Sequence, residues 1–184
     1  MRAVILAAGY GTRLGDLTKN KPKPLIEVDG KSVIEGIIDR LHIHGITEII
    51  VNLHYLPTVI TERIISKALY YYEPKLLGHE GTIHALKDWL KDDNFFVING
   101  DTISNVDFTQ MKILHEQGTI TALMDQWRCA GTWIYSKEYF DNRNLPIVAY
   151  RPLGLDWHDI GTPERLKEAQ EFYSCRQDEL QHKR

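Results

Sequence analysis

The chain has 184 residues, of which 43% are hydrophobic and 26% charged, so it can bury a core as one domain (residues 1–184) without disulfides or metals. A formal net charge of -3 without a dense Lys/Arg cluster argues against nucleic acid as a partner, because that affinity rests on many cationic contacts. No segment approaches the roughly 20 apolar residues of a membrane span, so we expect no membrane partner.

The first 118 residues alternate between apolar runs of strand length and segments of helical periodicity. Strands are predicted at residues 3–7, 48–52, 69–72 and 95–98. Helices are predicted at residues 32–44, 59–65, 82–90 and 108–117. Ser32 is the expected N-cap of the first helix and Gly45 its expected stop. This alternation is typical of a parallel sheet with helices on both faces.

The pattern changes after residue 118. Further strands are predicted at residues 119–124, 132–135 and 147–150, and a last helix at residues 163–173, followed by a fraying end after Ser174. We therefore expect a Rossmann-like three-layer α/β/α fold around a mixed, mainly parallel sheet. Because aromatic side chains bury large areas, Tyr70, Tyr72 and Trp89 are expected in its core.

The amino-terminal residues and the cysteines bear on the compartment. Residues 1–6 read directly into a strand, without a charged region followed by a long apolar stretch and a cleavage site. Cys129 and Cys175 lie far apart and have no companion cysteines at metal-binding spacing. Reduced thiols are the rule in the cytosol, so we expect a cytoplasmic protein.

The most informative segment is residues 6–14, L-A-A-G-Y-G-T-R-L, followed shortly by P-K-P-L. A strand that ends in small residues lets the backbone approach a ligand, and Gly9 and Gly11 can adopt the positive φ angles that turn amide groups toward an anion. Arg13 and Lys23 add a guanidinium suited to forked phosphate contacts and a mobile point charge. Glycines alone also mark ordinary turns, and the spacing fits neither the dinucleotide fingerprint nor a P-loop.

Two acidic residues follow apolar segments. Asp101 comes just after the predicted strand 95–98, where open α/β sheets bind ligands, although its N-G-D string is equally typical of a turn. Asp159 begins the string D-I-G-T-P-E, which also reads as a helix entry with Thr162 as N-cap and Pro163 at the first position.

Together these strings resemble the sugar-1-phosphate nucleotidyltransferase family, of the NDP-sugar pyrophosphorylase type. Its signature is L-A-A-G-x-G-T-R-L with P-K-P-L, then G-D after a hydrophobic strand and W-x-D-I-G-T-P-E. The resemblance implies the nucleotide-diphospho-sugar transferase fold, a Mg²⁺ cofactor, and an enzyme of the 2.7.7 type. Such an enzyme transfers a nucleotidyl group from a nucleoside triphosphate to a sugar 1-phosphate and releases pyrophosphate. Its product would be an NDP-sugar, which the resemblance implies is used to build cell-surface polysaccharide.

The same resemblance implies roles for individual residues. It places Arg13 near the departing β- and γ-phosphates and Lys23 near the α-phosphate, as the catalytic pair. It makes Asp101 and Asp159 the metal ligands. The implied nucleotide-binding residues are Leu6, Ala8, Gly9, Gly11, Thr12, Arg13, Lys23, Gly78, Glu80 and Asn99.

Two weaker matches accompany the main motifs. Residues 51–56, V-N-L-H-Y-L, are similar to a family element, although a loop histidine is also a sufficient explanation for His54. Residues 73–83, E-P-K-L-L-G-H-E-G-T-I, resemble the family's loop beside the base and ribose. There the family has small residues where this chain has His79 and Glu80, so the base is left open.

The stretch between Asp101 and Asp159 is short and departs from the family. It lacks the E-K-P element whose lysine meets the sugar phosphate. Arg128 and Gly131 are the candidate acceptor contacts, Arg128 as a replacement cation. The resemblance thus implies a short form of the family, with residues 1–118 as the nucleotide-binding part and 119–174 as a shortened acceptor-binding part.

Three functions follow from these observations. The first is nucleotidyl transfer to a small sugar phosphate such as a hexose or heptose 1-phosphate. The second is a cytidylyltransferase acting on a phosphorylated alcohol, and the third is a nucleotide-binding protein without turnover. A nucleoside triphosphate is the expected partner in all three, and a phosphorylated small-molecule acceptor is a partner in the first two. By analogy with the family we also expect a homo-oligomer.

Overall fold

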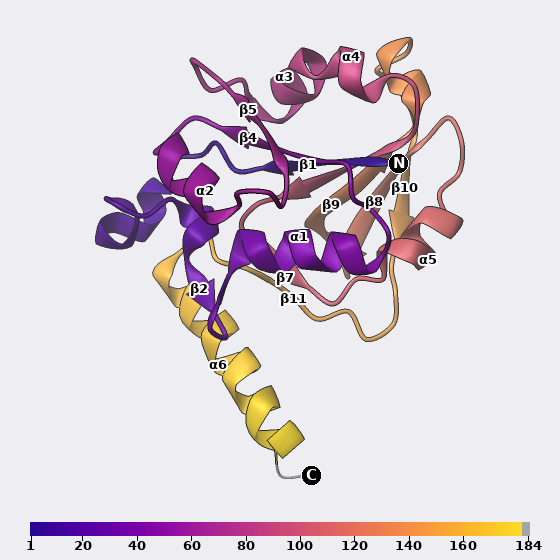
Figure 1. Ribbon diagram of the computed structural model, residues 1–184. Helices are drawn as coiled ribbons and strands as arrows, with labels where there is room; N and C mark the ends of the chain where they lie inside the picture. The colour runs from indigo at the N-terminus through magenta and orange to yellow at the C-terminus, as the bar shows by residue number, and fades with distance from the viewer. Residues whose placement is uncertain (182–184) are drawn as a thin grey trace.

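A seven-stranded mixed sheet forms the centre of the molecule (Figure 1). The structure is a computed structural model and describes residues 1–181. Across the sheet the strands are β10 (Ile147–Tyr150), β8 (Ile120–Asp125), β9 (Arg128–Tyr135), β6 (Phe95–Asn99), β1 (Arg2–Leu6), β4 (Ile49–Leu53) and β5 (Leu69–Tyr72). All neighbours pair in parallel except β9, which runs antiparallel to both β6 and β8. The predicted mixed, mainly parallel sheet is confirmed.

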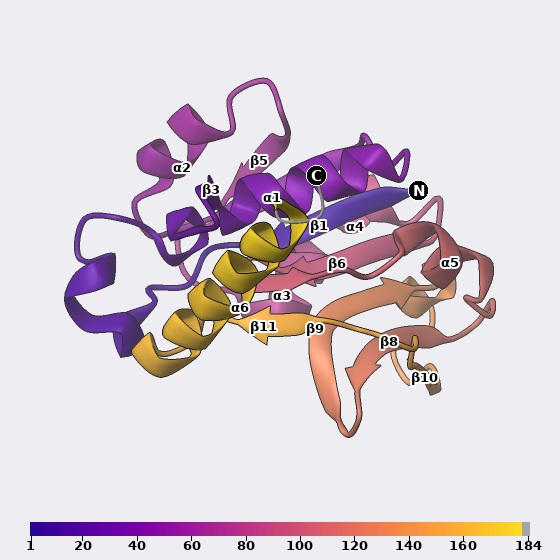
Figure 2. The ribbon, with the colours of Figure 1, turned by 90° about the horizontal axis from the view of Figure 1, so that it is seen from below.

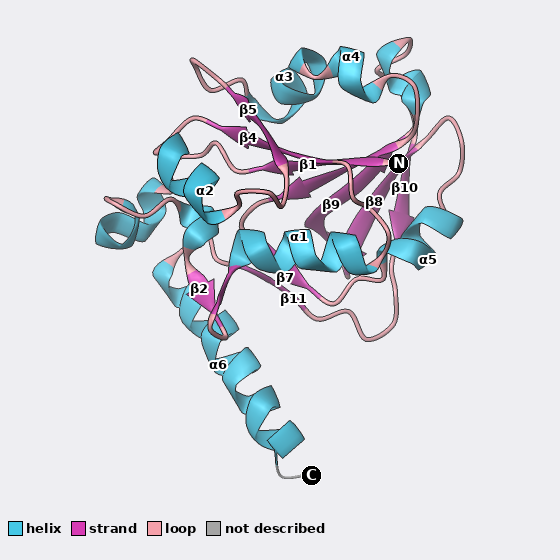
Figure 3. Cartoon of the chain, in the orientation of Figure 1, coloured by secondary structure: helices cyan, strands magenta, loops and turns pink. Residues whose placement is uncertain are grey.

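Helices cover both faces of the sheet (Figures 1 and 3). On one face lie α1 (Val33–Ile43), α2 (Pro57–Arg63), α5 (Phe108–Ile113) and α6 (Pro163–Gln181); on the other lie α3 (Gly78–Ala85) and α4 (Lys87–Leu90). Successive strand residues point to opposite faces, so Ile5 joins the core beneath α1 while Val4 joins the core beneath α3. The expected three-layer arrangement is confirmed.

Two small ribbons complete the fold. β2 (Glu27–Val28) and β3 (Lys31–Ser32) form a hairpin, and β7 (Thr102–Ser104) pairs antiparallel with β11 (Trp157–Asp159). Three 3-10 helices lie at Thr12–Thr18, Lys23–Leu25 and Lys137–Phe140. Seen from below, α6 runs beside β11, and the β8–β9 turn projects beyond the sheet (Figure 2). The β7–β11 pair brings residues 157–159 back beside the carboxyl end of β6.

Several boundaries differ from the sequence prediction. α3 begins at Gly78, four residues early, because Gly78 takes a positive φ of 70° and its carbonyl accepts a hydrogen bond from Thr82 Oγ1. α5 ends at Ile113. α6 continues to Gln181, beyond the predicted end at residue 173, and residues 174–181 contain no glycine or proline to stop a helix. The last three residues of the end predicted to fray, 182–184, lie outside the described residues.

The predicted burial of aromatic residues is partly wrong. Tyr70 and Tyr72 are 63% and 54% exposed, because β5 is an edge strand and has no neighbour on its outer side. Trp89 is half-buried against the core beneath α3, with the Arg2 guanidinium 5.2 Å from its ring centre. Among the described residues, no helix is both long enough and apolar enough to cross a bilayer.

Candidate active site

The strand order reverses between β1 and β6, and a cavity opens at this point. From β1 the chain moves outward to β4 and β5, then returns to β6 on the other side of β1. Open α/β sheets bind ligands at the carboxyl ends of strands at such a reversal. The cavity, here called the switch-point cavity, has a volume of about 400 Å³. Its lining is Leu6, Ala7, Gly9, Tyr10, Gly11, Thr12, Arg13, Lys23, Pro24, Asn99, Gly100, Asp101 and Gly161.

A tight turn after β1 forms one wall of the cavity. Gly11 has a φ of 68°, and a Cβ there would lie 3.0 Å from Thr18 Cγ2. The Gly11 carbonyl accepts hydrogen bonds from the Leu14 amide and from Thr18 Oγ1. The expected positive φ is therefore found at Gly11 but not at Gly9. Position 11 therefore requires glycine, both because its φ is positive and because a Cβ would lie too close to Thr18.

Gly100 lets the neighbouring strand approach the same turn. Its amide donates to the Leu6 carbonyl at 2.9 Å, and a Cβ on Gly100 would lie only 2.8 Å from that oxygen. Leu6 and Asn99 are paired residues of β1 and β6. Asp101 follows directly and is thereby fixed at the mouth of the cavity.

Lys23 and Asp101 meet across the cavity. Lys23 is only 9% exposed, and its Nζ donates a short hydrogen bond to Asp101 Oδ2. The rigid Pro22 and Pro24 flank Lys23 and fix its backbone. The pair joins residues 78 positions apart, one from each side of the strand-order reversal.

Asp159 reaches the same place through the β7–β11 ribbon. It is the register partner of Thr102, and the next amide, that of Ile160, donates to the Asp101 carbonyl at 3.0 Å. Its carboxylate accepts from the Gly161 amide at 2.8 Å and from Arg165 Nη1 at 2.8 and 3.0 Å. The two candidate metal ligands thus come from adjacent strands.

Arg13 lies beside this segment. A Cβ on Gly161 would lie 2.6 Å from Asp159 Oδ1 and 3.4 Å from Arg13 Nη2, so the guanidinium passes directly over Gly161. The four residues with proposed catalytic or metal roles, Arg13, Lys23, Asp101 and Asp159, are therefore brought together. Among the side chains that the structure describes, no group of three or more His, Cys, Asp or Glu residues gathers as a metal site.

A buried polar network supports the end of β1 from behind. The Ala7 amide donates to Asn52 Oδ1 at 2.6 Å, and Asn52 Nδ2 donates to Glu73 Oε1 at 2.9 Å. Glu73 is fully buried and also accepts from the Leu77 amide at 3.1 Å. The two weaker sequence matches thus meet at this network, which ties β1, β4 and the start of α3 together.

The candidate base-contacting residues lie apart from the cavity lining. Gly78 and Glu80 stand in the first turn of α3, and neither lines the switch-point cavity; nor does the buried Ala8. His79 packs edge-on against Trp133 at 4.7 Å, and its Nε2 lies 3.0 Å from the Tyr135 hydroxyl. Burial lowers the pKa of His79, against the nearby charge of Glu80, so the ring is neutral at pH 7.

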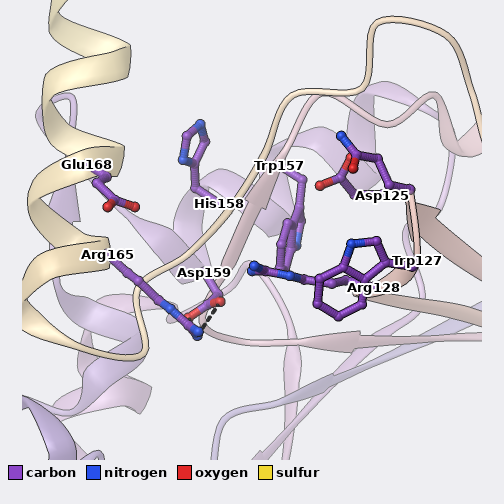
Figure 4. A pocket seen from close by; sticks show the side chains of 9 residues that line it. Asp125, Trp127, Arg128, Trp157, His158, Asp159, Arg165 and Glu168 are labelled. Carbon is purple, nitrogen blue, oxygen red and sulfur yellow. Dashed lines mark hydrogen bonds and ion pairs between the residues drawn. The ribbon is translucent and has the colours of Figure 1, made fainter.

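The two candidate acceptor contacts lie on β9. Gly131 has a φ of 69°, and a Cβ there would lie 2.9 Å from Thr102 Oγ1 and 3.1 Å from Asn99 Nδ2. Gly131 therefore stands directly beside the switch-point cavity. Arg128 is farther out, at the β8–β9 turn, where it lines a second cavity together with Asp159 (Figure 4).

Residues 2–128 match the family model for nucleotidyl transferases. The chain belongs to the nucleotidyl transferase family. Mannose-1-phosphate guanyltransferase of Saccharomyces cerevisiae is 36% identical over 135 residues, which cover 66% of this chain. The mannose-1-phosphate guanylyltransferase catalytic subunit beta of Dictyostelium discoideum is 33% identical over 132 residues. The chain spans about 37% of the length of these curated relatives.

The fold of this nucleotidyl transferase family member is shared with a solved structure. HddC from Yersinia pseudotuberculosis superimposes with a TM-score of 0.79 at 23% sequence identity. The match covers 94% of this chain and 99% of HddC. The Rossmann-like α/β assignment made from the sequence is confirmed by this likeness. The family resemblance is confirmed by the family model.

Sequence reasoning assigned no site role to several residues of the site in this nucleotidyl transferase family member, among them Tyr10, Gly161 and Arg165. Tyr10 and Gly161 both line the switch-point cavity, and Arg165 holds Asp159. Gly161 is part of the D-I-G-T-P-E motif, but the sequence alone gave it no role. Arg165 carried a signal of its own, because a cation in the first turn of a helix opposes the helix dipole.

Proposed function

We propose that this chain transfers a nucleotidyl group from a nucleoside triphosphate to a sugar 1-phosphate and releases pyrophosphate. The observation that carries the proposal is the convergence of two cations, Arg13 and Lys23, with two carboxylates, Asp101 and Asp159, at the strand-order reversal. Membership of the nucleotidyl transferase family supports it. Residues 1–118 would bind the nucleotide and residues 119–174 the acceptor.

The triphosphate would lie over the turn at Gly9, Gly11 and Thr12, with Asn99 and Leu6 at the strand ends. Arg13 would bind the departing β- and γ-phosphates, since its fork matches two phosphate oxygens. Lys23 would bind the α-phosphate. In the structure Lys23 is held by Asp101, which keeps its ammonium directed at the cavity. Gly78 and Glu80 would approach the base and ribose from α3.

The chemical step is a displacement at the α-phosphorus. An oxygen of the acceptor phosphate forms a bond to that phosphorus, and the bond to the bridging oxygen breaks, with its electron pair leaving on pyrophosphate. The acceptor phosphate is already ionised near neutral pH, so no side chain needs to remove a proton. Positioning and neutralisation of negative charge dominate such a reaction, and Arg13 and Lys23 supply both.

The donor set fits Mg²⁺. Asp101 and Asp159 offer hard carboxylate oxygens from the adjacent strand ends, and each is at present balanced by a cation, Lys23 or Arg165. Mg²⁺ keeps several waters and usually shares its shell with substrate phosphates, so two carboxylates suffice. When bound there, the ion neutralises triphosphate charge.

The curated relatives indicate which substrates to test first. Their names specify guanylyl transfer to mannose 1-phosphate, and HddC has been solved with GMP-PN. We therefore propose GTP as the first nucleotide and hexose and heptose 1-phosphates as the first acceptors, with Arg128 and Gly131 at the acceptor. The NDP-sugar formed in this way would serve the synthesis of cell-surface polysaccharide. A cytoplasmic site of action is supported by the free, exposed thiols of Cys129 and Cys175.

The proposal is tested by Mg²⁺-dependent pyrophosphate release. All common nucleoside triphosphates are scanned against sugar 1-phosphates and phosphorylated alcohols. The expected result is release for one pair, lowered at least ~100-fold in Asp101→Ala because the charge that organises the transition state is lost. Asp88→Ala, which removes an exposed carboxylate of α4, is the matched control and should leave the rate unchanged.

The other outcomes separate the alternatives. Release only with CTP and a phosphorylated alcohol would favour the cytidylyltransferase. If no pair reacts although a nucleotide raises the melting temperature, the chain is a nucleotide-binding protein without turnover, and the proposed activity is wrong.

A further inference from the structure

A second cavity, here called the hairpin cavity, adjoins the proposed site (Figure 4). It has a volume of about 330 Å³ and lies between the β8–β9 turn, β11 and the first turns of α6. Asp159 lines the hairpin cavity and Gly161 lines the switch-point cavity. The two cavities therefore meet at one three-residue segment, where a group bound in one can reach a group bound in the other.

The lining of the hairpin cavity suits a phosphorylated polyol. Trp127 and Trp157 offer apolar surfaces, and Asp125 and Glu168 offer carboxylates that accept hydrogen bonds from hydroxyl groups. The Arg128 guanidinium already lies over one face of Trp127, 4.9 Å from the ring centre, so that face is not open to a cationic ligand.

Arg165 enters the hairpin cavity from α6, opposite Arg128 (Figure 4). Arg165 is the third residue of α6, where a cation opposes the helix dipole, so helix stability does not account for it. Its Nη1 contacts both oxygens of Asp159. The hydrogen bond to Asp159 raises the pKa of Arg165, and the charges of Glu168 and Asp101 add to this effect, so the guanidinium lies in the field of three carboxylates.

We propose that Arg165 binds the phosphate of a sugar-phosphate acceptor, and that it moves there from Asp159 when a divalent cation takes that carboxylate. The inference rests on the proposed function. When the cation binds the Asp159 carboxylate, the Arg165 guanidinium no longer pairs with that carboxylate. It then lies beside the Asp159–Gly161 segment, where the acceptor phosphate would approach the α-phosphate bound by Lys23. A forked cation matches a dianionic phosphate better than a single carboxylate.

The decisive variant is Arg165→Met, which keeps an unbranched side-chain stem and removes the guanidinium with its charge. Lys167→Met is the matched control, because Lys167 lies on the same helix, is 76% exposed and does not line the cavity. Mn²⁺ binding is followed by electron paramagnetic resonance without substrates. Initial rates give the KM of the acceptor and the KM of the nucleotide. Thermal unfolding confirms that each variant is folded.

In Arg165→Met, Mn²⁺ should bind about two- to fivefold tighter, because a competing half-exposed ion pair is removed. The acceptor KM should rise about 10- to 100-fold, because a charge-assisted contact is lost. The nucleotide KM should stay within about twofold, and Arg165→Lys should recover part of the acceptor KM.

Unchanged acceptor KM in a folded, active Arg165→Met would overturn the inference and leave the proposed function standing. Unchanged Mn²⁺ affinity in Arg165→Met would overturn the proposed movement of Arg165 from Asp159 to the acceptor phosphate. If the wild-type chain turns over no nucleotide and acceptor pair, the proposed function is wrong and this inference is wrong with it.

Discussion

Two glycines, which have no side chain, decide how closely the ligand-binding segments approach each other. Gly100 brings β6 against the end of β1, and Gly161 leaves room for Asp159 and Arg13. Lys23 is almost completely buried, yet its ammonium faces the cavity. These positions serve the site more than the core, so their replacement should separate activity from stability.

Lys23→Ala should lower kcat about 100- to 1000-fold, because the α-phosphate loses its cation. The free energy of unfolding should fall by only about 1–2 kcal/mol, since the Asp101 partner stays partly exposed to water. Urea unfolding and steady-state kinetics provide the two values. Lys21→Ala, an exposed lysine two residues earlier, is the control and should change neither. Equal loss of activity and stability in Lys23→Ala would contradict the assignment.

Gly161→Ala should lower kcat/KM about tenfold or more, because a Cβ would displace the Asp159 carboxylate and the Arg13 guanidinium. Gly36→Ala in α1 is the matched control. Nothing lies within 4 Å of its new Cβ, so it should raise the free energy of unfolding by up to about 1 kcal/mol and leave the rate unchanged. Full activity in Gly161→Ala would show that Asp159 and Arg13 need not be close.

At the scale of elements, the carboxylate of Glu35 joins two helices. It accepts hydrogen bonds from Ser32 Oγ at the start of α1 and from Arg63 at the end of α2, and it pairs with Lys67. Burial by itself raises the pKa of Glu35. The bonds from Ser32, Arg63 and Lys67 outweigh burial and lower that pKa from 4.5 to about 2.

This depressed pKa predicts a pH dependence of stability. The carboxylate of Glu35 stabilises the fold above its unfolded pKa of 4.5, and the contribution is lost as the pH falls toward about 2. Glu35→Gln should therefore lower the free energy of unfolding at pH 7 by about 1–2 kcal/mol, with half-exposed partners limiting the effect. Urea unfolding between pH 7 and pH 3 should show the two proteins converging below pH 4.5. A constant difference would contradict this account.

Elements with a long, clear pattern were predicted from sequence, and short ones were not. Apolar runs located β1, β4, β5 and β6 to within one residue at each end. β7 and β11 have three residues each, too few for a periodic pattern, and they pair only through tertiary structure. The proximity of Asp101 and Asp159 was therefore accessible through the family motif, whereas the ion pair of Asp159 with Arg165 was not.

The exposure of side chains on the edge strand β5 was also not predicted from the sequence. Tyr70 and Tyr72 have the composition of a core strand, and only the strand order reveals that β5 is an edge. Likewise, the sequence located Lys23 and Asp101 as separate candidates, but their ion pair depends on the return of the chain from β5 to β6. Contacts between distant segments are fixed by topology, which local patterns do not specify.

For the whole molecule, the fold places two adjoining cavities at the carboxyl ends of the central strands. The switch-point cavity is lined by Arg13 and Lys23, which would bind the triphosphate under the proposed function. The hairpin cavity is lined by aromatic and carboxylate groups, which would bind the sugar. The segment from Asp159 to Gly161 separates them. In the proposed reaction each of the two phosphorylated substrates would have its own cavity, one lined by Asp101 and the other by Asp159.

The most direct test of this account is ³¹P NMR of the products formed from GTP, or the active nucleotide, and the active sugar 1-phosphate. The account predicts that the phosphorus of the sugar phosphate and the α-phosphorus of the nucleotide become coupled in one diphosphate. One pyrophosphate should appear for each such product, and neither should form in Asp101→Ala. Nucleoside monophosphate and pyrophosphate without incorporation of the sugar would mean hydrolysis, and would contradict the assignment of a transferase.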